Sequence, residues 1–302
     1  MQIVFDDCVL GVHGTDFEYI FSYSRGGPES IKIKGTEWVY RTPLPTFWRA
    51  TTCNDRGNHF SQRSSMWLGA DMFISVQDIK LCVDEKPLEK FTAPYNTALI
   101  GSPLEHPHSV EIAYTYETTT APSTTVSVRY RVEESGRIIV KAEYQGKPEL
   151  PELPAFGLRF SMPEPADGYE YTGLSGETYP DRMAGGVQGT WRVKGLPVTP
   201  YLVPQECGMH MQTEKVTVLK AESSFTVTQN DIPFAFSALP YTSEELENAT
   251  HQEELPAPRR TVLCIFGAVR GVGGIDSWGT DVCPEYHIDA GTNHIFSFII
   301  NN

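Results

Sequence analysis

Apolar residues recur at every second position along much of this 302-residue chain, and this period constrains the fold more than any other feature. Residues 126–132 have the sequence VSVRYRV, and the alternation resumes at Ile138 and Val140. A period of two places these apolar side chains on one face of a β-strand. The intervening residues 134–136, Glu-Ser-Gly, are a turn sequence, so this segment predicts a β-hairpin.

Further strands are expected along the whole length, separated by glycines and prolines. They cover residues 31–33, 110–116, 155–160, 216–219, 224–227, 234–237, 262–268 and 294–300. The compositional breaks at 117–123, 146–154 and 253–258 are interpreted as loops, because the strands on both sides need partners. We therefore predict an all-β fold, a large antiparallel sandwich in which residues 1–302 form a single domain.

Helix is expected to be scarce. Thr242 and Glu245 form a capping box ahead of Leu246 and Ala249, which predicts one short helix. Residues 58–68 are a weaker candidate for a second.

The charge balance excludes several classes of partner. Lys and Arg number 24 against 38 Asp and Glu, for a net charge of −14, and nucleic-acid binding needs clustered cations. The longest apolar runs, 262–266 and 295–300, are far shorter than the roughly 20 residues of a membrane helix. The N-terminal residues lack the pattern of a signal peptide, and the six cysteines form no C-x-x-C pair. These features predict a cytoplasmic protein with free thiols and no nucleic-acid or membrane partner.

Four segments combine glycine, aromatic and polar residues where an ordinary strand would not. They are residues 47–57, 171–182, 201–210 and 271–279. The Asn-Asp-Arg-Gly end of the first predicts a turn. We expect the four to be long loops at one rim of the sandwich, where functional residues usually lie.

The fourth segment places three glycines ahead of Trp278, and glycine permits unusual backbone conformations that can lift an indole out of the core. A flat aromatic ring suits the apolar face of galactose, so Trp278 is a candidate sugar platform. The alternative is that Trp278 closes the end of the sandwich core, and this segment alone does not separate the two. A phosphate loop is rejected, because no Lys-Ser/Thr pair or helix follows the glycines.

Candidate acidic residues give no catalytic pair. Glu177 and Asp181 are four residues apart, but Pro180 prevents them from sharing a helix face. Asp181 followed by Arg182 favours a loop ion pair or an acceptor for backbone N–H groups. Glu206 is equally consistent with loop anchoring and with ligand contact.

The histidines and cysteines predict neither a metal site nor a nucleophile in this chain. No histidine has metal-ligand spacing, and only His59, in the segment after Gly57, is retained as a ligand contact. His251 follows the predicted short helix and is expected to be structural. Cys53 and Cys207 lie in rim segments without an adjacent histidine, so inert packing is favoured.

Taken together and in order, these motifs resemble the C-terminal domain of the large bacterial β-galactosidases of glycoside hydrolase family 2. The similarity is greater still to the separate small chain of the heterodimeric, lactobacillal-type enzymes. The matching stretches are residues 47–57, 154–160, 173–182, 204–208, 234–237, 249–251 and 271–279, so the resemblance spans essentially the whole chain.

The resemblance implies a β-supersandwich like that of galactose mutarotase. It also implies a retaining glycoside hydrolase complex, in which a separate large chain carries the catalytic acid and nucleophile and binds magnesium and sodium, while this chain binds no cofactor. This chain would complete the site for lactose or other terminal β-D-galactosides, with transgalactosylation as a further activity, and would be inactive alone.

The resemblance also carries specific residues. Trp278 matches the tryptophan that stacks on the sugar, and the stretch beginning at Gly57, with Asn58 and His59, matches a mobile substrate loop. We expect loop support from Asn54, Asp55, Glu206 and Asp276. Cys53 and Cys207 depart from the usual aspartate and asparagine, which puts any hydrogen-bonding role at those positions in doubt.

Two alternatives remain open at this stage. One is a freestanding mutarotase-like epimerase that uses His210 with Glu206 or Glu177 as its acid and base. The other is a carbohydrate-binding module without chemistry.

Overall fold

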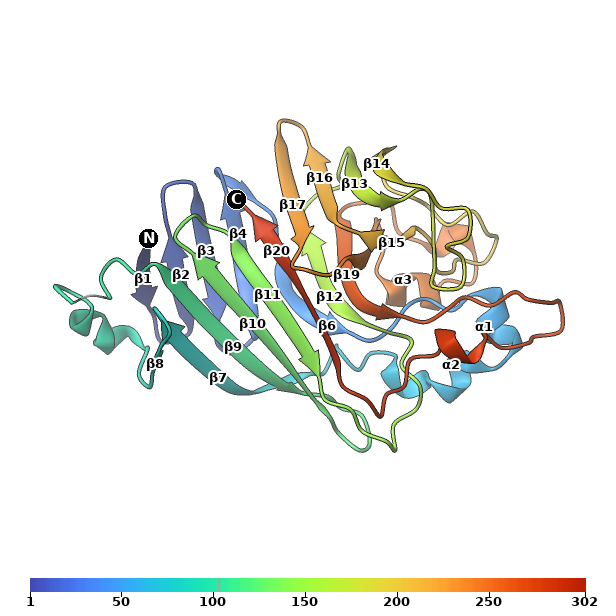
Figure 1. Cartoon of the computed structure of the whole chain (residues 1–302), viewed down its shortest axis with the longest axis horizontal. Helices are drawn as coiled ribbons and strands as arrows, with labels where there is room; N and C mark the ends of the chain where they lie inside the picture. Colours follow the sequence, from blue (N-terminus) through green and yellow to red (C-terminus); the bar gives the residue numbers. More distant parts are fainter. Residues whose placement is uncertain (103) are drawn as a thin grey trace.

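Antiparallel strands form most of the regular structure in the computed structural model, which describes residues 1–102 and 104–302 (Figure 1). The strands are β1 (Gln2–Phe5), β2 (Val9–His13), β3 (Phe17–Ser22), β4 (Gly27–Ile33), β5 (Thr36–Glu37), β6 (Arg41–Thr46), β7 (Ser75–Val83), β8 (Lys86–Leu88), β9 (Ser109–Glu117), β10 (Thr125–Glu133), β11 (Ile138–Tyr144), β12 (Ala155–Met162), β13 (Gly168–Leu174), β14 (Gln188–Lys194), β15 (Met209–Thr213), β16 (Lys215–Lys220), β17 (Ser223–Gln229), β18 (Phe234–Leu239), β19 (Thr261–Val269) and β20 (His294–Asn301). The helices are short: α1 (Cys53–Gly57), α2 (Phe60–Arg63), α3 (Ser243–Asn248) and four 3₁₀ turns at Ser65–Trp67, Ala93–Ala98, Gln252–Glu254 and Pro284–Tyr286.

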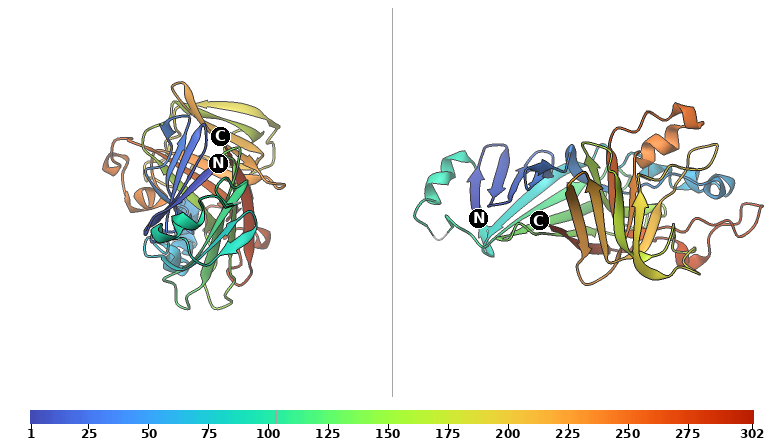
Figure 2. Two further views of the ribbon diagram at one scale, coloured as in Figure 1. Left: turned by 90° about the vertical axis from the view of Figure 1, so that its left-hand side faces the viewer. Right: turned by 90° about the horizontal axis from the view of Figure 1, so that it is seen from above.

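The strands form three sheets. One contains β1 to β5 in order, the second has the order β14-β13-β16-β17-β20-β11-β10-β9-β7-β8, and the third has the order β15-β18-β19-β12-β6. The first sheet lies at one end of an elongated molecule, and the three α-helices gather at the other (Figures 1 and 2). The antiparallel all-β prediction is confirmed.

The predicted hairpin shows how the alternation specifies the register. β10 pairs with β11 so that Val132 faces Ile138 and Val126 faces Tyr144. Gly136 closes the turn with φ +87°, a conformation that favours glycine. Each of the other strands expected from the sequence lies within an observed strand.

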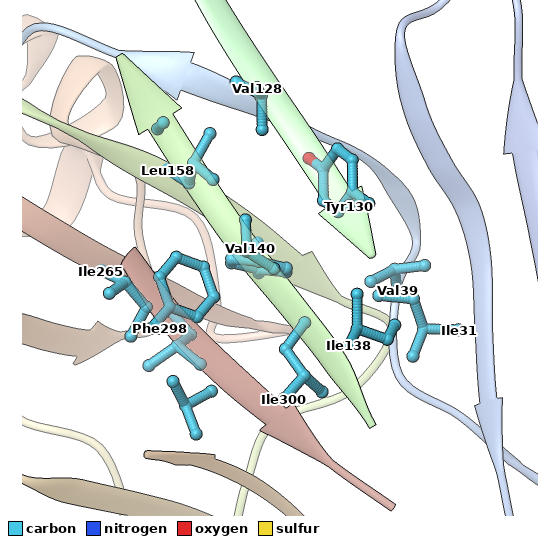
Figure 3. Close-up of a cluster of buried hydrophobic side chains, with 14 of the residues drawn as sticks. Ile31, Val39, Val128, Tyr130, Ile138, Val140, Leu158, Ile265, Phe298 and Ile300 are labelled. Atoms are coloured by element: carbon cyan, nitrogen blue, oxygen red, sulfur yellow. The ribbon is translucent and has the colours of Figure 1, made fainter. Parts of the chain in front are cut away.

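The main core lies between the large sheet and the other two. Figure 3 shows Val140 of β11 and Phe298 of β20 next to Leu158 and Ile265 of the third sheet, with Ile31 of the first sheet close by. One cluster of buried apolar side chains runs through all three sheets, from Ile3 to Ile300. The three sheets therefore share one core.

The helices were predicted unevenly. The capping box of Thr242 and Glu245 is present at α3, as expected, and α2 lies within the weak candidate segment 58–68. The turn expected at residues 54–57 was wrong, because these residues belong to α1. Its start is fixed by a second capping box, in which Thr52 accepts from the backbone N–H of Asp55 and the carboxylate accepts in return.

Several strands were not predicted, chiefly β1 to β3, β6 to β8 and β13 to β15. The loop prediction for segments 171–182 and 201–210 was wrong at residues 171–174, which lie in β13, and at residues 209–210, which lie in β15. The sequence of β6, RTPLPT, contains two prolines, which disfavour strand prediction. None of the helices in residues 1–102 and 104–302 combines the length and apolar character needed to cross a membrane.

Candidate functional site

The structure brings the four glycine- and aromatic-rich segments together at the end of the molecule that carries α1 and α2 (Figure 1). Hydrogen bonds link the segments directly. The donors and acceptors are Asn54 Nδ2 to Val272 O at 3.0 Å, Cys53 N to Gln205 Oε1 at 3.0 Å, Gly208 N to Glu177 Oε2 at 2.5 Å and Gly273 N to Asp181 Oδ2 at 2.8 Å. Together they make one continuous surface.

That surface contains an open pocket of about 520 Å³ to which every segment contributes three residues. They are Thr52, Cys53 and Asn54; Glu177, Tyr179 and Arg182; Tyr201, Gln205 and Glu206; and Val272, Gly273 and Gly274. The mixture of amide, carboxyl and phenol groups suits a polyhydroxylated ligand.

A buried charge cluster, which we call the base of the candidate site, adjoins the pocket, because Asp55 accepts hydrogen bonds from the lining residue Thr52. Both carboxylate oxygens of Asp55 accept from Arg49, at 2.7 and 3.2 Å, and one accepts from Arg270 at 3.0 Å. All three side chains are almost completely buried. Although burial opposes ionisation, the Arg49 guanidinium and the Thr52 hydrogen bonds hold the pKa of Asp55 below its usual range.

The same cluster ties segments that are far apart in the sequence. Arg49 also donates to the carbonyl oxygen of Gly271 at 2.8 Å, and Arg270 reaches Glu152 at 2.6 Å and the carboxylate of Asp281. The start of the Trp278 loop is therefore fixed to α1 through buried, charge-assisted hydrogen bonds.

The segment from Gly57 to His59 lies at the C-terminal end of α1. Asn58 donates to Asp281 at 3.2 Å and accepts from the backbone N–H of Phe60 at 2.9 Å, so both ends of its side-chain amide are engaged. His59 is exposed and adopts φ +65°, which is uncommon outside glycine. Of the two, His59 has the freer side chain for contact with a ligand.

The Trp278 loop approaches this segment through glycine. Gly279 has φ +84°, and a Cβ atom there would lie 2.9 Å from the carbonyl oxygen of Gly57. Trp278 itself is 90 % exposed, which excludes the core-plug interpretation. Asp276 accepts from the backbone N–H of Trp278 at 2.9 Å and from the Thr280 hydroxyl at 2.5 Å, so a local turn orients the loop.

Among the carboxyl groups that line the pocket, Glu206 has the most perturbed pKa. Its side chain is buried, and burial raises its pKa to about 8, while nearby Glu177 acts in the same direction and Arg49 against it. With this pKa, most Glu206 carboxyl groups are protonated at pH 7, and the protonated form can donate a hydrogen bond. Asp181 accepts from the backbone N–H groups of Val272 and Gly273, the role expected for it.

The geometry disfavours the epimerase alternative. His210 is buried against Tyr171 and Phe236, and both ring nitrogens have partners at 2.8 Å, Tyr169 Oη and the carbonyl oxygen of Gly176. Burial lowers its pKa to about 4. The imidazole is thus neutral and engaged, and is not available as an acid or base.

The remaining candidate residues are the two rim cysteines, Cys53 and Cys207, and His251. Burial raises the pKa of the Cys207 thiol, which agrees with inert packing and disfavours a thiolate nucleophile. The packing expected for Cys53 was wrong, because its side chain is exposed and lines the pocket. His251 contacts Glu254 at 3.1 Å rather than the end of α3. Within the described residues no three potential ligands of His, Cys, Asp or Glu type gather at one point.

The sequence analysis missed Arg49, Arg270 and Asp281. Arg270 is 221 residues from Arg49 in the chain, and no local pattern joins them. The only available signal was the capping-box spacing of Thr52 and Asp55, which places the Asp55 carboxylate at a helix start but does not reveal the arginines around it.

An all-β chain with an aromatic loop beside a polar pocket is typical of carbohydrate-active proteins, and the comparisons define the class. Residues 13–300 match the family model described as β-galactosidase small chain. The β-galactosidase small subunit of Latilactobacillus sakei is 54 % identical over all of this chain and 98 % of that protein. The chain belongs to the β-galactosidase small chain family, and its role is that of a small subunit of a β-galactosidase.

Longer relatives contain a region similar to this chain as one part of their length. A β-galactosidase of Halalkalibacterium halodurans is 33 % identical over all of the chain, and one of Lactobacillus delbrueckii subsp. bulgaricus is 34 % identical over 96 % of it. The chain spans 28 % and 26 % of these two proteins.

Among solved structures, a galactose 1-epimerase of Lactobacillus acidophilus aligns over 97 % of this chain and 93 % of its own, with 8 % identity and a TM-score of 0.48. A galactose mutarotase-like protein of Lactobacillus casei aligns over 97 % and 99 %, with 11 % identity and a TM-score of 0.43.

Proposed function

We propose that this chain completes the galactoside site of a separate large chain that carries the catalytic acid and nucleophile. The observation that carries the proposal is the exposure of Trp278, whose indole stands in solvent on the same loop whose Val272, Gly273 and Gly274 line the open pocket. An indole held this way by Asp276 and Gly279 offers a flat face for a sugar, for which the large chain supplies the opposite wall.

The acids of this chain support a site without catalysis of its own. A retaining glycosidase needs two free carboxyl groups about 5 to 5.5 Å apart. Glu177 and Asp181 instead accept hydrogen bonds from backbone N–H groups, and Asp55 is locked between two arginines. The isolated chain is therefore expected to be inactive toward galactosides.

The proposed substrates are lactose and other terminal β-D-galactosides, bound with Trp278 and the Gly57 to His59 segment at the mouth of the site. Asn54, Asp55, Glu206 and Asp276 support these loops. Magnesium and sodium are assigned to the large chain, and the complex is assigned to the cytoplasm.

The test mixes the purified chain with the matching large chain and follows hydrolysis of a chromogenic galactoside, with light scattering on the same samples. We expect activity and a hetero-oligomer only in the mixture. Steady turnover by the isolated chain, with contamination excluded, would contradict the assignment of catalysis. Separate species at concentrations that give full activity would contradict the partnership.

A further inference from the structure

A second pocket lies outside the candidate site, where β6, residues 71–74 and the β3–β4 turn meet. Its volume is about 460 Å³, and its lining includes four arginines, Arg25, Arg41, Arg159 and Arg260. This is unusual in a chain whose net charge is −14.

Two of the four arginines already have carboxylate partners. Arg159 contacts Asp71 and Glu244, each at 2.9 Å, and Arg260 contacts Glu245 at 2.7 Å. Arg25 and Arg41 are exposed and form no ion pair within residues 1–102 and 104–302. The pocket therefore presents two unpaired arginines, and with Asp71, Glu244 and Glu245 counted against the four arginines the cluster keeps a net positive charge.

Exposed apolar side chains surround these charges. Tyr40 and Met72 line the pocket with 58 % and 62 % of their surface exposed, and Phe73, next in the chain, is 70 % exposed. The Arg41 guanidinium lies 5.5 Å from the centre of the Tyr40 ring. Arginine, aromatic residues and methionine are the residue types enriched at protein interfaces. We call Arg25, Tyr40, Arg41, Met72 and Phe73 the Tyr40 patch.

The patch adjoins the candidate site through α3. Thr242, the N-cap of α3, lines the arginine pocket, while Glu247 near its other end accepts from the backbone N–H of Thr51 in the first rim segment at 2.6 Å. A six-residue helix is about 9 Å long, so a partner seated on the rim is close enough to reach the patch.

We propose that the Tyr40 patch is a docking surface for the large chain, with a carboxylate of that chain entering the pocket between Arg25 and Arg41. This inference rests on the proposed function and names a contact away from the substrate. Docking occurs through side chains, because β6 is an edge strand and its Pro43 and Pro45 cannot donate to an added strand.

The test measures the affinity of the large chain for Arg41→Glu and Met72→Glu variants by titration calorimetry. Each is expected to raise the dissociation constant at least about tenfold, because like charges are brought together or a charge is buried. Matched controls are Arg129→Glu, on an exposed position of β10, and Ile232→Glu, where 74 % of the side chain is exposed. The controls should bind as the wild type does, and all four should keep the wild-type melting temperature.

The outcomes separate the two proposals. If the wild-type chains do not associate, the proposed function is wrong. If they associate and the patch variants bind as the controls do, only the docking surface is wrong. If the patch variants instead abolish self-association of this chain and leave large-chain binding intact, the occupant is a second copy, and the assignment to the large chain is wrong.

Discussion

The candidate site has two parts, the base formed by the buried charge cluster and a tip formed by the Trp278 loop. Both reverse the usual placement of charged and apolar groups. At the base, the charged side chains of Arg49, Asp55 and Arg270 are buried, whereas at the tip the indole of Trp278 is exposed. Buried charges require partners in a fixed geometry, so the base defines where the loops start. An exposed indole contributes little favourable free energy until a ligand or another chain covers it. The contribution of the tip therefore depends on such a partner.

Replacing Asp55 tests the base and should give the largest effect. Asp55→Asn leaves Arg49 buried without a carboxylate contact, and breaking a buried ion pair costs about 3 to 5 kcal/mol. We expect a loss of this size in the free energy of unfolding, measured by urea denaturation of the isolated chain at pH 7. A loss below about 1 kcal/mol would mean that the cluster does not hold the base together.

Glu206 provides a pH-dependent test of the same region. Its folded pKa is about 8, against about 4.3 for an unfolded glutamate, so the folded state binds more protons between these values. Stability contributed by this group therefore falls as pH rises through that window and levels off above about pH 8.

Glu206→Gln cannot ionise and should escape this loss. Its stability relative to wild type should improve by about 2 kcal/mol between pH 6 and pH 8 and stay constant above that. Denaturation curves at each pH give the comparison, with Glu253→Gln as an exposed control. A stability difference from wild type that does not change with pH would show that Glu206 is already ionised in the folded chain.

Trp278 tests the tip. Trp278→Ala should raise the apparent KM of the two-chain enzyme ten- to hundredfold, because an aromatic stacking contact is worth about 1 to 3 kcal/mol. The share of galactosyl groups transferred to water, and not to an acceptor sugar, should also rise, because a weakly held acceptor sugar leaves before it can react. The melting temperature should not change. A fall in thermal stability with unchanged KM would instead assign the indole a structural role.

Asp276 should give the smallest effect. Asp276→Ala removes the acceptor for the Trp278 backbone N–H and the Thr280 hydroxyl, so the loop samples more conformations. We expect a roughly threefold rise in apparent KM from the added ordering cost, with kcat unchanged. An effect as large as that of Trp278→Ala would mean that the turn, and not the stacking face, controls binding.

The sequence was most informative where side chains act locally. Alternation in residues 126–132 predicted β10, and Thr242 with Glu245 predicted α3. Trp278 and the four rim segments stood out by composition. The charged base did not, because Arg49 follows β6 and Arg270 follows β19, which come together only after both have paired with β12, and charge pairing has no sequence period. The turn assigned to residues 54–57 failed because the Thr52 cap was overlooked.

The position of β20 in the large sheet has a consequence for synthesis. Residues 294–301 lie between β17 and β11, so the two halves of the ten-stranded sheet have no direct pairing with each other. While the chain emerges from the ribosome, both neighbours present open edges until this late strand inserts. Such long-range closure is slow and leaves edges that can aggregate. Expression yield should therefore depend sharply on residues 294–301, even though they lie outside the candidate site.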